Sequence, residues 1–288
     1  MRDFLKATAG TFAVAELVGC AESAHDHPHE GVAEMSSAVP VGVQLFCFRH
    51  LLEQDFEHTL AQVATLGYAG EEFAGYYGYV DKPAELRALL DVQVAGAHLG
   101  LPVLEGDELQ RPIDFHGELS NTNLIVAGLA EDRRTDRDEV LRTAETFTTT
   151  QEKLRKHGMQ TGYYYHAYSF NQDMGSDTIW DLIAQNTPSD MILQLDTGNA
   201  AHGGADVVQI INDNPDRINS MHVKPYLQGA EEPFEAFIGE DGLPWEEIFD
   251  RSEEVGGIKW YVVEYEQESH PPLEALKANH ECVAGFGR

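Results

Sequence analysis

Apolar runs and amphipathic stretches alternate along the chain from Val41 onward. The apolar runs are five to seven residues long, as is typical of buried parallel strands, and the stretches between them repeat hydrophobic residues at helical spacing. We expect strands at 41–47, 68–73, 92–98, 123–127, 162–166, 192–196, 218–222 and 260–264. We expect helices near 55–66, 83–90, 136–157, 178–185, 205–212, 245–255 and 273–282, with a weakly marked helix between 106 and 119.

Eight strands and eight helices in strict alternation indicate one parallel α/β barrel, because each parallel strand needs a crossover connection to reach the next. Such a barrel typically takes about 250 residues, and this chain has 288. We therefore predict a single (β/α)8 TIM barrel over residues 39–288. We expect residues 1–38, whose composition differs, to form a separate signal-like segment and flexible tether.

Four of the expected strands end in a residue that can bind a divalent metal. They are His166, Asp196, His222 and Glu264, separated by 30, 26 and 42 residues. These gaps are about one strand-plus-helix unit, and the C-terminal ends of the strands meet at one rim of a barrel. Taken singly, each residue could be a helix cap, a core histidine or an ordinary rim residue. Taken together, they predict a site that would suit Mn²⁺, Mg²⁺, Co²⁺ or Zn²⁺.

Acidic residues far outnumber basic ones. There are 49 Asp and Glu against 19 Lys and Arg, a formal net charge of −30, and only seven of the basic residues are lysines. Such a surface repels nucleic acid and anionic membranes, so we expect no nucleic-acid partner. The acidic excess is spread along the whole chain, as in halophilic proteins, where about 1 M salt shortens the Debye length to roughly 3 Å. An acidic enzyme from an ordinary organism is the alternative.

The first residues resemble an export signal. Arg2-Asp3-Phe4-Leu5-Lys6 is similar to the right half of a twin-arginine (Tat) motif, with Met1 where the first arginine would stand. An Ala-, Gly-, Thr- and Val-rich stretch follows, and Leu17-Val18-Gly19-Cys20 is similar to a lipoprotein cleavage box. We therefore expect an exported protein with a lipid anchor at Cys20. If this incomplete signal is not functional, the protein is cytoplasmic.

Four short motifs stand in or beside expected strands, and a fifth stands in the loop before the helix expected near 245–255. Residues 67–73 read GYAGEEF, 195–199 LDTGN, 221–224 MHVK, 239–245 GEDGLPW and 262–264 VVE. They resemble the GY-x-G-x-E turn, aspartate strand, H-x-K strand, GxGxxxW loop and final glutamate of the xylose-isomerase-like barrels. This family includes sugar isomerases, ketose 3-epimerases and inosose dehydratases. The resemblance covers about residues 41–282.

The fifth strand departs from one branch of that family, which has YHNHxxEF where residues 163–170 read YYYHAYSF. Tyr164 stands at the first histidine and Ser169 at the glutamate, while His166 keeps the second histidine. Pro225 replaces the acid that often follows Lys224. These departures concern the first metal ligand and the substrate.

The resemblance implies a divalent-metal-dependent isomerase or epimerase that acts on a sugar or sugar derivative. The ion would stabilise an ene-diolate as a Lewis acid while Glu264 removes a proton next to the carbonyl. Glu72 and His98, at the ends of the second and third strands, are the candidates for a second acid or base. The candidates for binding the substrate are Lys224, Tyr164, Asn199 and Trp245.

Two alternatives stay open. The same groups could expel a hydroxyl or glycosidic group from a keto-sugar, keto-cyclitol or 3-keto-glycoside, which would make the protein a dehydratase or lyase. The Tyr164 and Ser169 replacements instead suit a non-catalytic sugar-binding lipoprotein. All three hypotheses have a small carbohydrate as the partner and are compatible with a homo-oligomer.

Overall fold

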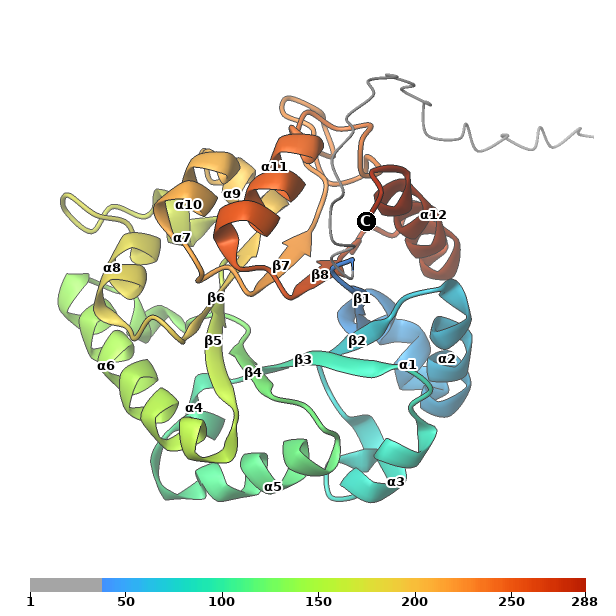
Figure 1. The fold of residues 1–288 in the computed structure, drawn as a ribbon, viewed down its shortest axis with the longest axis horizontal. Coiled ribbons are helices and arrows are strands. Elements are labelled where there is room, and N and C mark those ends of the chain that lie inside the picture. Colours follow the sequence, from blue (N-terminus) through green and yellow to red (C-terminus); the bar gives the residue numbers. More distant parts are fainter. Residues whose placement is uncertain (1–37) are drawn as a thin grey trace, which may run out of the picture.

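A computed structural model describes residues 38–288, which form a closed barrel of eight parallel strands in sequence order, surrounded by helices (Figure 1). The strands are β1 (Val41–Gln44), β2 (Gly70–Phe73), β3 (Gln93–Leu99), β4 (Asn123–Val126), β5 (Gln160–Tyr164), β6 (Ile192–Asp196), β7 (Ser220–Val223) and β8 (Trp260–Val263). The expected (β/α)8 TIM barrel is confirmed. The signal-like segment and Cys20 lie outside the described residues, so export and lipidation stay predictions.

The helices follow the expected stretches, with extra turns between them. They are α1 (Arg49–Gln54), α2 (Phe56–Val63), α3 (Pro83–Leu89), α4 (Leu101–Leu104), α5 (Gln110–Glu118), α6 (Arg137–Leu154), α7 (Tyr168–Asn171), α8 (Ile179–Asn186), α9 (Thr197–His202), α10 (Val207–Asp213), α11 (Trp245–Arg251) and α12 (Pro272–Gly285). Hydrophobic periodicity did not predict the short helices α1, α4, α7 and α9, which follow β1, β3, β5 and β6. No helix within residues 38–288 combines the length and the apolarity of a membrane span.

Local sequence explains where several helices begin and end. The Asp55 side chain accepts a hydrogen bond from the backbone of α2 and caps its first turn. Thr178 and Asp181 cap α8 reciprocally. The 3-10 turn η2 (Ala64–Leu66) ends at Gly67, whose φ of 99° is left-handed and favours glycine. The two ends of the expected helix at 55–66 are therefore set by local chemistry.

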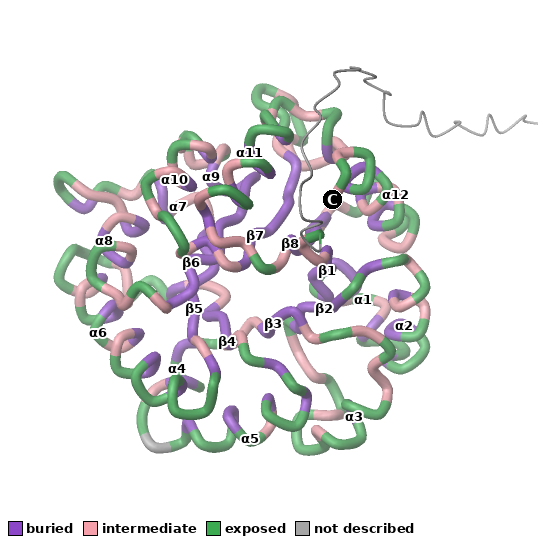
Figure 2. Tube along the Cα trace, viewed as in Figure 1, coloured by how far each residue is buried: buried purple, intermediate pink, exposed green. Residues whose placement is uncertain are grey.

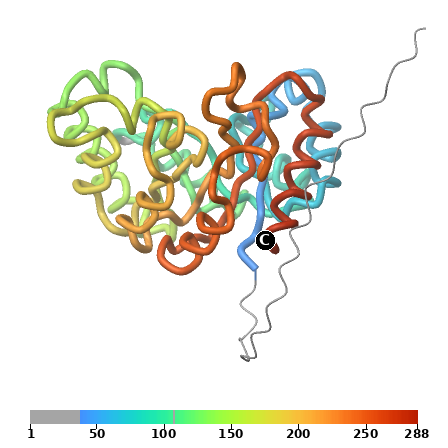
Figure 3. Tube along the Cα trace, turned by 90° about the horizontal axis from the view of Figure 1, so that it is seen from above, coloured from blue at the N-terminus to red at the C-terminus, as the bar shows by residue number. Residues whose placement is uncertain are grey.

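The first and last elements lie side by side and close the ring. β1 pairs in parallel with β8, with Val41 opposite Tyr261. Helix α12, red in Figure 3, lies beside the blue N-terminal helices and contacts both η2 and the 3-10 turn η1 (Leu45–Phe48). This closure places the C-terminal ends of all eight strands around one rim.

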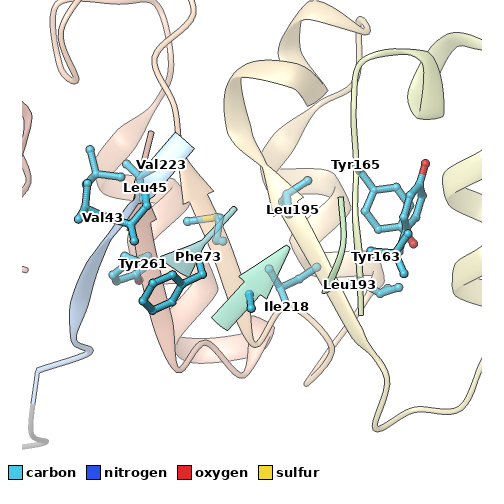
Figure 4. Packing of buried hydrophobic residues seen from close by; sticks show 14 of the residues in the cluster. Val43, Leu45, Phe73, Tyr163, Tyr165, Leu193, Leu195, Ile218, Val223 and Tyr261 are labelled. Carbon is cyan, nitrogen blue, oxygen red and sulfur yellow. The ribbon is translucent and has the colours of Figure 1, made fainter. Parts of the chain in front are cut away.

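The main hydrophobic core lies between the barrel and its helices. Figure 2 shows buried strands at the centre and helices with exposed outer sides. Figure 4 shows part of this core, with Tyr163 next to Tyr165 at a ring-centroid distance of 4.2 Å and with Val43 and Phe73 from other strands. Each such side chain contributes about 1.5–3 kcal/mol on burial. Because these outward-facing residues stabilise the fold, the inward faces of the strands are free to carry polar groups.

The interior of the barrel contains a buried polar layer beside a small apolar cluster. The apolar cluster consists of Ile125, Tyr164 and Ile192. The buried polar side chains come from four strands and are Gln44, Glu72, Gln194, Ser220 and His222. Buried polar groups must satisfy one another by hydrogen bonding, and this layer lies directly against the predicted metal-binding residues.

Candidate active site

Three of the four predicted metal-binding residues meet at the C-terminal rim of the barrel. Asp196 ends β6, His222 lies in β7 and Glu264 directly follows β8. The strand register pairs Asp196 with His222 and Val223 with Val263, so the backbone itself brings these side chains together. One potential ligand atom from each residue lies within 4.8 Å of the other two, and all three residues are buried. We call Asp196, His222 and Glu264 the rim cluster.

His166, the fourth predicted ligand, is not part of the rim cluster. β5 ends at Tyr164, and the His166 ring stacks on Tyr168 with a centroid distance of 5.6 Å and an interplanar angle of 13°. Burial lowers the pKa of His166 to about 4, so the imidazole is neutral. Its Nδ1 has no hydrogen-bond partner among residues 38–288. The expected four-residue cluster therefore forms from three of its members.

Tyr164 fills the corner of the rim cluster nearest β5. Its hydroxyl donates to Asp196 Oδ2 at 2.6 Å, lies 3.3 Å from Glu264 Oε2 and accepts a hydrogen bond from Asn199 Nδ2 at 3.0 Å. Tyr164 pairs with Gln194, two residues before Asp196, so its side chain starts one layer below the rim. The length of the phenol lets the hydroxyl reach the rim. Tyr164 and Asn199, both predicted to bind substrate, thus border the cluster.

Asp196 has a second structural role. Its Oδ1 accepts a hydrogen bond from the backbone N–H of Asn199 at 2.6 Å and caps α9. Burial raises the pKa of Asp196, while the positive charge of Lys224 opposes that rise. The remaining oxygen, Oδ2, faces the Tyr164 hydroxyl. This oxygen is the one that a metal ion would engage without disturbing the cap.

Both nitrogens of His222 face carboxylates. Nδ1 contacts Glu264 Oε2, and Nε2 lies 2.7 Å from Glu72 Oε1. Burial disfavours the imidazolium, but Glu72 and Glu264 outweigh it and raise the pKa of His222 to about 10. Burial likewise disfavours ionised Glu72, yet His98 and His222 hold its pKa below the ordinary value. His222 is therefore a cation between two carboxylates at neutral pH.

Lys224 lies on the outer side of the rim cluster. Its Nζ is 3.1 Å from Glu264 Oε1 and also bonds Glu266. Burial disfavours the charged amine, but Glu264, Asp196 and Glu266 raise the pKa of Lys224 above its ordinary value. Burial and the charge of Glu264 raise the pKa of Glu266 to about 7. A charged ammonium group thus lies within hydrogen-bonding distance of Glu264.

The other predicted residues, Glu72, His98 and Trp245, are not part of the rim cluster. Glu72 of β2 is fully buried, and the His98 side chain of β3 is 10% exposed with its ring parallel to that of His222 at 5.3 Å. Trp245 begins α11, where its indole donates to Asp241 at 2.6 Å and packs on Phe249. These contacts place Trp245 in the packing of α11.

Gln44 and Gln194 border the candidate site, although no motif in the sequence indicated them. Each lies in an apolar strand, and each donates a hydrogen bond of 2.7 Å to Glu72. A glutamine inside a buried strand needs hydrogen-bond partners. The sequence therefore indicates that each glutamine has a hydrogen-bond partner inside the barrel. It does not identify that partner, which lies on another strand.

The donor set at the rim fits a divalent metal ion. Two carboxylates and one imidazole, buried together, suit Mn²⁺, Mg²⁺, Co²⁺ or Zn²⁺. The Tyr164 hydroxyl adds a polar oxygen between the two carboxylates. Within residues 38–288 a second group of potential ligands, Glu72, His98 and His222, shares His222 with the rim cluster.

Curated proteins of similar sequence are inosose dehydratases, although no family model matches the chain. The chain is 25% identical over 266 residues to inosose dehydratase from Lacticaseibacillus casei, covering 78% of this chain and 88% of the relative. It is 21% identical over 267 residues to inosose dehydratase from Lactiplantibacillus plantarum, covering 80% and 88%. These relatives are enzymes.

Solved structures share the barrel. A sugar phosphate isomerase/epimerase from Parabacteroides distasonis superposes with a TM-score of 0.73 at 21% identity, covering 90% of this chain and 100% of that one. The IOLI protein with a bound zinc atom gives 0.64 at 11% identity, covering 86% and 97%. An L-ribulose 3-epimerase gives 0.63 at 16% identity, covering 86% and 95%. The resemblance to xylose-isomerase-like barrels that the motifs indicated is thereby confirmed.

Proposed function

We propose that this protein is a divalent-metal-dependent isomerase or epimerase acting on a sugar or sugar derivative. The convergence of Asp196, His222 and Glu264 at the C-terminal rim, where TIM-barrel enzymes hold their active sites, carries the proposal. When bound there, a divalent ion supplies Lewis-acid polarisation of a carbonyl and a neighbouring hydroxyl oxygen. The inosose dehydratases and the sugar phosphate isomerase/epimerase to which the chain is similar support a sugar-like substrate.

Glu264 is placed to take the proton from the carbon beside the carbonyl. Burial opposes its ionisation, but Lys224 and His222 hold the pKa of Glu264 well below its ordinary value, so the carboxylate is available as a base. One base can remove a proton from one carbon and return it to the next on the same face, which is an isomerisation. Epimerisation needs a second group on the opposite face. Of Glu72 and His98, only His98 is partly exposed.

The position of Lys224 also favours an elimination reaction. Its ammonium group lies 3.1 Å from the Glu264 carboxylate, so an acid and a base stand side by side. Glu264 would take the proton beside the carbonyl, and the C–O bond at the next carbon would break. Lys224 would protonate the departing oxygen, so that water or an alcohol leaves. The inosose dehydratase relatives support this dehydratase or lyase alternative. Its substrate would be a keto-sugar, keto-cyclitol or 3-keto-glycoside.

Proton exchange in D₂O tests the proposal and separates the two reactions. Protein stripped with EDTA and reloaded with Mn²⁺, Mg²⁺, Co²⁺ or Zn²⁺ is incubated with aldoses, ketoses, a keto-cyclitol and a 3-keto-glycoside. The proton NMR signal beside the carbonyl is then followed. Metal-dependent loss of that signal with a new sugar isomer is expected for an isomerase or epimerase.

Loss of the signal with a released hydroxyl or aglycone and a new conjugated carbonyl would identify a lyase. If no compound exchanges a proton while a sugar still binds, both catalytic proposals are refuted. The sugar-binding hypothesis would then stand.

A further inference from the structure

Glu72 is buried inside the barrel, and neither the proposed isomerisation nor the alternative elimination assigns it a step. Its carboxylate accepts hydrogen bonds from side chains on four other strands. Oε1 lies 2.7 Å from Gln44 Nε2, 2.7 Å from His222 Nε2 and 3.0 Å from His98 Nε2, and Oε2 lies 2.7 Å from Gln194 Nε2. With 0% exposure, Glu72 has no direct path to a substrate at the rim. Its surroundings therefore indicate a role inside the barrel.

The neighbours of Glu72 fix which atoms face it. The backbone N–H of Phe46 can only donate, and it bonds Gln44 Oε1 at 3.0 Å, so the amide NH₂ of Gln44 must face Glu72. The NH₂ of Gln194 also reaches Ser220 Oγ at 2.9 Å, while its Oε1 lies 2.8 Å from His98 Nε2. An amide NH₂ group donates hydrogen bonds and offers no lone pair to a cation. The hydrogen-bond donors around Glu72 therefore suit an ionised carboxylate that binds no metal ion.

The backbone makes room for this carboxylate. The register between β2 and β3 shifts between Glu71 and Glu72, which brings Gly96 opposite Glu72. A Cβ atom on Gly96 would lie only 2.8 Å from Glu72 Oε2. The glycine and the register shift together leave room for the carboxylate inside the barrel.

We propose that Glu72 is a positioning residue that orients His222 for metal binding. A hydrogen bond from Nε2–H to Glu72 keeps the proton on Nε2, so Nδ1, which faces the rim cluster, is the nitrogen that releases its proton to solvent when it binds the ion. The rings of His98 and Tyr164 pack on His222 at 5.3 and 4.7 Å and restrict its rotation. The inference rests on the proposed metal-dependent function and assigns Glu72 positioning in place of proton transfer.

The test compares Glu72→Gln with Glu71→Gln in the full chain. Both substitutions replace a carboxyl group by an amide at adjacent positions on β2. The Glu71 carboxyl lies near Asp91, just after α3, rather than near His222. Mn²⁺ affinity of EDTA-stripped protein is measured by isothermal titration calorimetry. Glu72→Gln is expected to weaken Mn²⁺ binding roughly 10- to 100-fold, as loss of an outer-shell partner does, whereas Glu71→Gln should leave it unchanged.

The His222 imidazole gives a readout that does not depend on activity. In ¹⁵N-labelled protein loaded with Zn²⁺, Nε2 should carry a slowly exchanging proton shifted downfield by its hydrogen bond to Glu72. Glu72→Gln should move this signal upfield and speed its exchange, and Glu71→Gln should not. A merely structural role for Glu72 would lower stability without changing this signal. If Glu72→Gln fails to fold, Glu72→Asp, which keeps the charge but shortens the side chain, should show the same changes.

Three results would overturn the inference. Unchanged Mn²⁺ affinity and unchanged His222 signals in a folded Glu72 variant would refute it while leaving the metal-dependent function standing. Binding of a second ion that Glu72→Gln removes would refute it, because Glu72, His98 and His222 would then form a second metal site. Wild-type protein that binds no divalent ion would refute the proposed function together with the inference.

Discussion

Replacing the buried acid Glu71 by glutamine should remove a pH-dependent loss of stability. The residue is 2% exposed, and its Oε2 has no hydrogen-bond partner within the described part of the chain. Burial, assisted by the negative charge of Asp91, raises the pKa of Glu71 from 4.5 to about 8. Glu71 therefore stays protonated in the folded protein at a pH where the unfolded chain has lost the proton.

The size of the effect follows from the linkage between protonation and folding. Between pH 4.5 and about 8, the unfolded state releases a proton that the folded state keeps. The free energy of unfolding therefore falls as the pH rises, by about 1.4 kcal/mol per pH unit. Over the whole interval the loss reaches roughly 5 kcal/mol, and above the folded pKa it no longer grows. Glutamine carries no charge at any pH and should abolish this slope.

Denaturant unfolding of wild type and Glu71→Gln at fixed high salt measures the difference. The two proteins should be similarly stable at about pH 5, and the variant should be more stable by several kcal/mol at about pH 9. Parallel stability curves would refute the reasoning. Glu72→Gln is the matched contrast, because the pKa of Glu72 is lowered and its charge stabilises the folded state at neutral pH. That variant should be less stable than wild type at both pH values.

Three further predictions concern the site and the surface. Glu264→Gln should abolish metal-dependent deuterium exchange with an unchanged circular dichroism spectrum, and wild-type exchange would remove Glu264 from the mechanism. Asp196→Asn should lower bound metal measured by mass spectrometry while the asparagine still caps α9; unchanged metal content would leave Asp196 a cap only. Raising KCl from about 0.1 M to about 1 M, which shortens the Debye length from about 10 to 3 Å, should raise Tm because the net charge is −30. A Tm independent of salt would contradict the halophilic hypothesis.

Much of the barrel and part of the site could be predicted from the sequence because both depend on local patterns. Hydrophobic periodicity located all eight strands, and the expected strand at 192–196 matches β6. Asp196, His222 and Glu264 could be predicted because parallel strands bring their C-terminal ends to one rim. His166 stands at a strand end of the same kind. Whether its side chain joins the cluster depended on where β5 ends and on how far the neighbouring phenol of Tyr164 reaches.

Glu71 and Glu72 show what the sequence determined and what it could not. As adjacent glutamates in a short strand they are chemically identical. The strand-end position and the motif resemblance singled out Glu72, but the sequence did not indicate the charge of either residue. The tertiary structure gives them opposite pKa shifts. Glu72 meets donors from four other strands, whereas Glu71 is buried beside another acid. Ionisation of a buried carboxyl depends on partners that are distant along the chain, so only the closed barrel could decide which glutamate is charged.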